Sequence, residues 1–161
     1  QALRQIKMHL EAVGGAGDRG IDLVGHFLVD DPPARIEELQ DQSGCAIVVQ
    51  CKSLTDKVGV QTVREFEGAL SRYRVDGYRR GRVLGMVCGH SGFSSGAFAQ
   101  CQRSHHPMVL VNFSDETCAE LAAFFTNELV SKAVPGLVVA DQPRASPSGL
   151  VRAPVVLFKD K

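Results

Sequence analysis

Tryptophan is absent from the sequence, and aromatic residues of all kinds make up only 6% of its 161 residues. A surface that binds single-stranded nucleic acid by stacking bases on aromatic rings is therefore not indicated. An excess of one charge is missing too, because 18 Lys and Arg residues balance 18 Asp and Glu residues. Overall charge thus provides no argument for nucleic-acid binding, which has to rest on a local arrangement of residues.

Long hydrophobic runs are also missing. The longest, such as 46–49 and 137–140, are far too short to cross a bilayer, so we expect no membrane association. The chain begins with Gln1, and we expect it to be a fragment of a longer protein. Its 44% hydrophobic and 22% charged residues exclude a disordered chain and predict a single globular domain over residues 1–161, with a core at about 14–139 and a loop and edge strand within 141–161.

Cysteine is present, but without the CxxC pairs typical of zinc sites. Three of the five cysteines share a position inside an apolar, strand-like run: Cys45, Cys51 and Cys88. A thiol in such a run acts as a small hydrophobic group, and a reducing intracellular compartment is the simplest interpretation. A zinc site formed by Cys101 with His105 or His106 is an alternative, but it lacks a second close pair of ligands.

Apolar periodicity predicts alternating strands and helices. Strands are predicted at 21–29, 45–52, 82–90, 107–113 and 137–139, with a final edge strand at 155–158. Helices are predicted at 59–74, after Ser94 and Ser95, and at 114–129. The segment before Val13 is compatible with a short helix or an edge strand. This order predicts an α/β fold with a central sheet flanked by helices, and the short link between the first two strands adds an antiparallel pair, which makes the sheet mixed.

Two short segments carry the residues that point to a reaction. In the first, glycines turn the chain sharply before a strand that presents Asp22, and in the second an apolar strand ends in Gln50 and Lys52. Residues two apart on a strand share a face, so Gln50 and Lys52 project together. Cys51 then points into the core, while its backbone carbonyl remains available to a cation. If the two strands are neighbours, Asp22, Gln50 and Lys52 converge at one face of the sheet.

Such a set suits Mg²⁺-assisted hydrolysis of a phosphodiester. Asp22 and the side-chain oxygen of Gln50 are hard oxygen ligands of the kind that Mg²⁺ prefers. A metal ion held there polarises the phosphate and lowers the pKa of a bound water. Lys52 can orient that water or stabilise the extra negative charge of the transition state. A turn aspartate or a solvated lysine alone is more often structural, but the combination favours a functional site.

The amino-acid sequences of these segments resemble those of a known superfamily. Three stretches share its pattern: 17–23 (GDRGIDL), 49–52 (VQCK) and 58–70. They are similar to the Mrr-like branch of the PD-(D/E)xK nuclease superfamily, and the similarity covers roughly residues 14–113. Residues 14–22 are similar in sequence to fungal mitochondrial respiratory-growth proteins of this clan.

The resemblance implies a restriction-endonuclease-like fold and a Mg²⁺- or Mn²⁺-dependent endonuclease that acts on DNA in mitochondria. It implies catalytic roles for Asp22, Gln50 and Lys52, with metal binding by Asp22, Gln50 and the backbone carbonyl of Cys51. A homodimer is compatible with it. The clan often has an acidic residue on a helix before the glycine turn, whereas here only Glu11 precedes the turn, in strand-like surroundings. This departure, together with Gln in place of Glu at 50, supports an alternative: a nuclease-fold module that binds DNA or a protein partner without cleaving.

Two further patterns compete with this site. Residues 92–96 match the G-x-S-x-G nucleophile elbow between a strand and a helix. An α/β-hydrolase also needs an acid followed by a histidine, and no histidine follows Asp115, so we favour helix capping by the serines. A basic run is the one clear positive patch, and it indicates either phosphate contacts or a solvated helix end. Its members are Arg72, Arg74, Arg79, Arg80 and Arg82.

Overall fold

The structure is a computed structural model, and it describes residues 3–5, 7–13, 20–28, 45–73, 83–114, 121–146 and 149–159. The strands are β1 (Leu3–Gln5), β2 (Lys7–Ala12), β3 (Leu23–Leu28), β4 (Ala46–Lys52), β5 (Val83–Gly89), β6 (Met108–Phe113), β7 (Leu121–Thr126), β8 (Leu137–Ser146) and β9 (Gly149–Lys159). The helices are α2 (Val60–Arg72), α3 (Ser95–Arg103) and α4 (Glu128–Ala133).

A six-stranded sheet in the order β2-β3-β4-β5-β6-β7 forms the centre of the fold. The two central pairings, β4–β5 and β5–β6, are parallel, and the outer pairings are antiparallel. The predicted α/β class with a mixed sheet is therefore confirmed, including the antiparallel pairing of the first two predicted strands, β3 and β4. A second sheet, in the order β1-β9-β8, joins the start of the chain to its last two strands.

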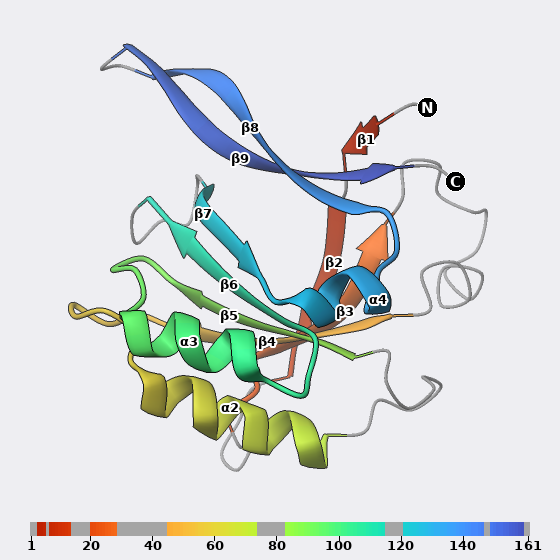
Figure 1. Ribbon diagram of the computed structural model, residues 1–161, viewed down its shortest axis with the longest axis vertical. Coiled ribbons are helices and arrows are strands. Elements are labelled where there is room, and N and C mark those ends of the chain that lie inside the picture. The colour runs from red at the N-terminus through yellow and green to blue at the C-terminus, as the bar shows by residue number, and fades with distance from the viewer. Residues whose placement is uncertain are drawn as a thin grey trace.

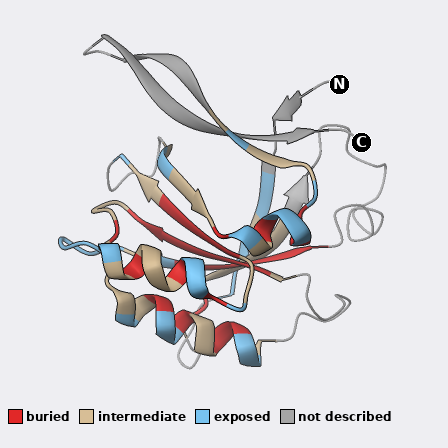
Figure 2. Ribbon diagram, viewed as in Figure 1, coloured by how far each residue is buried: buried red, intermediate tan, exposed pale blue. Residues whose placement is uncertain are grey.

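The sheet separates two hydrophobic clusters, and Figure 1 shows the helices that pack against it. On one face α2 and α3 lie side by side and bury residues such as Phe66 and Ala97 against Val48 and Val87. On the other face α4 contributes Val130 to a cluster that includes other residues of β4 and β5. Figure 2 shows the buried residues running through the middle strands and along the inward sides of the helices. The central strands are covered on both faces, as expected for parallel strands.

The predicted helix at 114–129 is wrong over residues 121–126, which form β7 at the edge of the sheet. Residues 115–120 lie outside the described residues. The apolar spacing of this segment suits a helix, but β7 pairs with β6 and places consecutive phenylalanines on opposite faces. Phe125 packs against the cluster beneath α2 and α3, whereas Phe124 packs against the cluster beneath α4. Only a strand lets two adjacent residues serve both cores.

The two ends of the chain also differ from expectation. The ambiguous N-terminal segment forms strands β1 and β2, and Glu11 lies on β2. The loop predicted within 141–161 is wrong, because β8 and β9 form a long antiparallel hairpin from Leu137 to Lys159. Pro143 lies in β8, an edge strand of its sheet, which is where proline is tolerated within sheets.

Close approach of α2 to β5 generates a stability prediction. Gly85 of β5 is buried beneath α2, and a methyl group at this position would overlap the side chain of Leu70 and lie 3.0 Å from Cε1 of Phe66. Gly85→Ala should therefore destabilise the fold by about 1–3 kcal/mol, because the packed core has no room for an extra methyl group. Urea unfolding of the purified chain measures the change.

A glycine on the exposed side of the same contact provides the control. Gly68 lies within α2, and a methyl group there meets only the end of the Arg72 side chain at 3.6 Å. Gly68→Ala should stabilise the protein by about 0.5–1 kcal/mol, because alanine loses less backbone entropy in a helix. Equal effects of the two substitutions would contradict the observed packing of α2 on β5.

Candidate functional site

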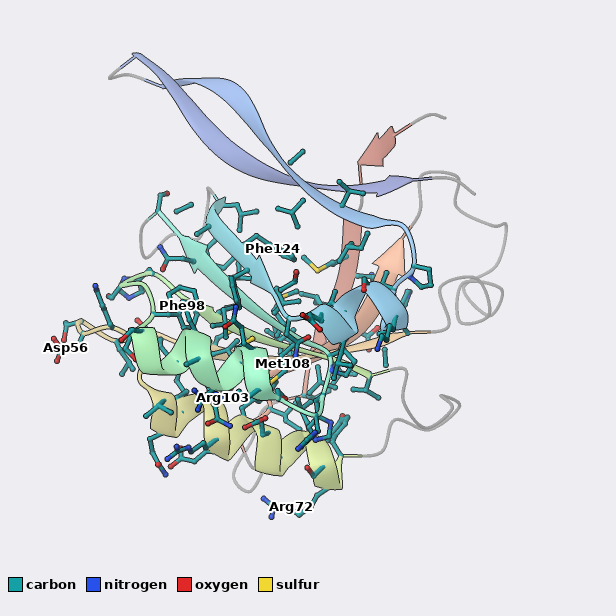
Figure 3. The ribbon with its side chains drawn as sticks, in the orientation of Figure 1. Asp56, Arg72, Phe98, Arg103, Met108 and Phe124 are labelled. Carbon is teal, nitrogen blue, oxygen red and sulfur yellow. The ribbon has the colours of Figure 1, made fainter. Side chains whose placement is uncertain are left out.

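The end of β4 changes from apolar to polar over three residues. Residues 45–49 are fully buried, with exposed fractions of 0–1%, and Gln50 remains buried at 5%. Lys52 is half-buried, and Asp56 in the loop that follows reaches solvent (Figure 3). Gln50 is the register partner of Val87, which belongs to the cluster beneath α2 and α3, so Gln50 projects to the face that these helices cover. Lys52 lies two residues further along the strand and projects to the same face. The predicted shared orientation of Gln50 and Lys52 is confirmed.

Gly20 allows the Gln50 amide to be buried. Its backbone has a φ of 81°, in the left-handed region that favours glycine. A methyl group on Gly20 would lie 2.5 Å from Nε2 of Gln50. Gly20 is therefore required twice, for the turn into β3 and for the space that the amide occupies.

Asp22 lies beside the same stretch of β4. Its backbone N–H donates to the carbonyl oxygen of Val49 at 2.9 Å, and its Oδ2 accepts from the backbone N–H of Cys51 at 2.7 Å. The pairing of β3 with β4 begins only at Leu23, so β3 offers no backbone acceptor to the N–H of Cys51. The Asp22 carboxylate accepts that hydrogen bond instead. Two of the predicted residues, Asp22 and Gln50, are brought to the same end of the β3–β4 pair, and Lys52 follows two residues after Gln50.

The donor atoms at this position fit a hard cation in part. Oε1 of Gln50 is buried and has no hydrogen-bond partner among the described residues, which is costly for a polar atom unless a ligand compensates for it. Oδ2 of Asp22 is used by Cys51, but a carboxylate has a second oxygen that can bind a cation. Oxygens of these two kinds suit Mg²⁺ or Mn²⁺. Within the described part of the chain, no group of three or more His, Cys, Asp or Glu residues could hold a metal ion, so the set has a single carboxylate.

Two details of the sequence prediction are wrong. The strand predicted at 21–29 begins only at Leu23, so Ile21 lies before it and packs in the same cluster as Val24. Cys51 does not enter the core, because its side chain is exposed to solvent. Its backbone carbonyl stays a predicted ligand.

The Cys51 thiol has a neighbour that the sequence reasoning missed. The pKa of Cys51 lies below its usual value, first because the Cys88 thiol hydrogen-bonds to it, while burial and the charge of Asp22 act in the opposite direction. Cys88 is its register partner on β5. The two residues end parallel apolar runs of similar length, and this is the signal that could have paired them.

The competing patterns have structural explanations. Ser94 is the N-cap of α3 and its Oγ accepts from the backbone N–H of Ala97 at 3.2 Å, which confirms the capping interpretation of the G-x-S-x-G pattern. Burial, and secondarily the charge of Glu67, raises the pKa of Cys101 to about 12, and this fully buried thiol is directed to the backbone carbonyl oxygen of Met108. His106 instead shares a hydrogen bond with the hydroxyl of Ser71 at 2.9 Å.

The predicted basic patch is described only at its first member. Arg72 is exposed in the last turn of α2, where its charge complements the helix dipole (Figure 3). The other members, Arg74, Arg79, Arg80 and Arg82, lie outside the described residues. No described helix is long and apolar enough to cross a membrane.

Comparison with known proteins assigns a family. A family model described as "Required for respiratory growth protein 7" matches residues 1–132. The chain belongs to this family. An uncharacterized mitochondrial protein of Schizosaccharomyces pombe is 33% identical over 111 residues, which cover 67% of this chain and 38% of the relative. The chain therefore matches well under half of that relative's length. No solved structure matches.

The contact between Gly20 and Gln50 generates a prediction about the site's construction. Gly20→Ala should destabilise the protein by about 1–2 kcal/mol for the left-handed backbone, and by about 1 kcal/mol or more in addition, because the buried amide must move. Gly92 is the matched control, since its φ is 80° and a methyl group there meets nothing within 4 Å.

The comparison is made by urea unfolding of both alanine variants, alone and combined with Gln50→Ala. Gly20→Ala should cost more than Gly92→Ala in the wild-type background and about the same when Gln50 is truncated. A cost of Gly20→Ala that does not depend on Gln50 would show that the two residues are not in contact.

Proposed function

We propose that this respiratory-growth family member is a metal-dependent DNA endonuclease of the PD-(D/E)xK type that acts in mitochondria. The observation that carries the proposal is the buried Gln50 amide, whose Oε1 has no hydrogen-bond partner and lies on the strand that holds Asp22 through Cys51. Mitochondrial location is inferred from the name of the S. pombe relative. The resemblance of residues 17–23 and 49–52 to the Mrr-like branch supports the choice of reaction and substrate.

In this proposal each residue has a separate task. Asp22, Gln50 and the backbone carbonyl of Cys51 hold Mg²⁺ or Mn²⁺, which when bound polarises the phosphate and acidifies water. Lys52 stabilises the negative charge that develops on the phosphate, or orients the attacking water, from its half-buried position at the end of β4. The Cys51 N–H fixes the Asp22 carboxylate, so the ligand does not have to be ordered during binding.

A second candidate is a nuclease-fold module that binds DNA or a protein partner without cleaving it. The observation in its favour is that the described residues include no cluster of three or more His, Cys, Asp or Glu, so Asp22 is the one carboxylate among the proposed ligands, the fewest with which Mg²⁺ is commonly bound. In such a module Lys52 has no special role, and the basic residues that follow α2 dominate binding.

Removal of the Asp22 charge tests the proposed metal site. Asp22→Asn keeps an oxygen that can accept from the Cys51 N–H, so the fold should be retained, while cleavage of DNA with Mg²⁺ or Mn²⁺ should fall by about two orders of magnitude or more. Asp56→Asn removes the same charge from the exposed loop after β4 and should leave cleavage unchanged. Cleavage at equal rates by wild type and Asp22→Asn would place the activity elsewhere.

Truncation of Lys52 separates the enzyme from the binding module. Lys52→Ala should lower the single-turnover cleavage rate about 100- to 1,000-fold and change DNA affinity little, because charge stabilisation acts mainly in the transition state. Lys57→Ala, in the exposed loop, is the control. In the module, by contrast, changing Arg72, Arg79 and Arg80 together weakens salt-dependent DNA binding more than Lys52→Ala does. If the wild type cleaves neither duplex, branched nor single-stranded DNA with either metal, the proposed endonuclease function is refuted.

A further inference from the structure

Two thiols lie side by side at the end of the central parallel strands. Cys51 of β4 and Cys88 of β5 are register partners in the parallel pairing of these strands. Partners in adjacent strands project to the same face of a sheet. Cys51 is exposed, whereas Cys88 is buried at 8%. One thiol of the pair therefore meets solvent, and the other is within its reach.

The backbone spacing of this pair permits a covalent bond. Adjacent strands lie about 4.7–4.9 Å apart, and disulfides join residues whose Cα atoms are about 4.4–6.8 Å apart. Two thiols on register partners of adjacent strands need only rotate and approach. The other described cysteines differ, because Cys45 and Cys101 are both fully buried. Cys101 also directs its thiol to the carbonyl oxygen of Met108.

We propose that Cys51 and Cys88 are a site of reversible oxidative modification, in which a peroxide converts the two thiols into a disulfide between β4 and β5. Exposed Cys51 reacts first: its sulfur attacks one peroxide oxygen, the O–O bond breaks, and a sulfenic acid and one water form. The sulfur of Cys88 then attacks the Cys51 sulfur, the S–O bond breaks, and a second water leaves with the remaining thiol proton. The two sulfurs lose two electrons in total, and hydrogen peroxide accepts both.

The location of the pair connects it to the candidate site without making it depend on the proposed function. Cys51 is flanked by Gln50 and Lys52, and its backbone N–H holds Asp22 on the side of β3, while its thiol meets Cys88 on the side of β5. The thiol chemistry follows from the pairing of β4 with β5 and stands whether or not the chain cleaves DNA.

The experiment treats the reduced, folded 161-residue chain with hydrogen peroxide, alkylates the remaining thiols and maps the tryptic peptides by mass spectrometry. Peptide 36–52 should become linked to peptide 83–103 with loss of two hydrogen atoms, and fragmentation should place the bond at Cys51 and Cys88. Addition of a thiol reductant should restore both peptides. Cys45→Ser, which changes a fully buried cysteine just before β4, is the matched control and should leave the link intact.

Two variants make the order of events testable. Cys51→Ser changes an exposed side chain, so it should fold normally and lose the link. Cys88→Ser should also lose the link, and it should leave a sulfenic acid at Cys51 that a dimedone reagent captures. The proposal is overturned if peroxide leaves both thiols intact, if Cys51 is oxidised while Cys88 stays a thiol in the wild type, or if the bond joins either residue to another cysteine.

Discussion

Burial of β4 on both of its faces is the constraint on which the rest of the structure depends. Residues 45–49 have almost no exposed surface, so one side of the strand requires α2 and α3 and the other requires α4. Neighbouring strands must also satisfy its backbone groups, because buried N–H and C=O groups are costly when unpaired. β3 and β5 meet this requirement, one antiparallel and one parallel. The polar end of β4 is thereby brought beside the turn that carries Asp22.

The two buried side-chain amides among the described residues illustrate different uses of a polar side chain. Asn127 is 5% exposed, and it accepts from the N–H of Met108 and donates to the carbonyls of Cys101 and His106. These bonds join the start of α4 to the end of α3 and the start of β6, which is a structural role. Gln50 is equally buried, yet its Oε1 has no partner. An unpaired buried oxygen costs about 1–3 kcal/mol, so its presence favours a ligand at that position.

Parallel pairing also explains why the candidate site and the thiol pair are neighbours. Parallel strands end at the same edge of a sheet, so the last residues of β4 and β5 lie together. Strand alternation then places Gln50 and Lys52 on the face covered by α2 and α3, and it places Cys51 and Cys88 on the opposite face. One strand end thus presents the Gln50 amide and the Lys52 ammonium on one side and thiol groups on the opposite side.

Local patterns by themselves determined β4, β5, α2, α3 and the Ser94 cap, because strand alternation, helical spacing and capping are encoded within a few consecutive residues. Strand alternation also placed Gln50 and Lys52 on one face of the sheet. Tertiary structure alone decided that residues 121–126 form a strand, because β6 had an unpaired edge and both cores needed a phenylalanine. It also decided the burial of Gln50 against Gly20, the exposure of Cys51 and the contact of Cys51 with Cys88. These depend on which strands become neighbours and where their covering helices end, and no short stretch of sequence specifies either.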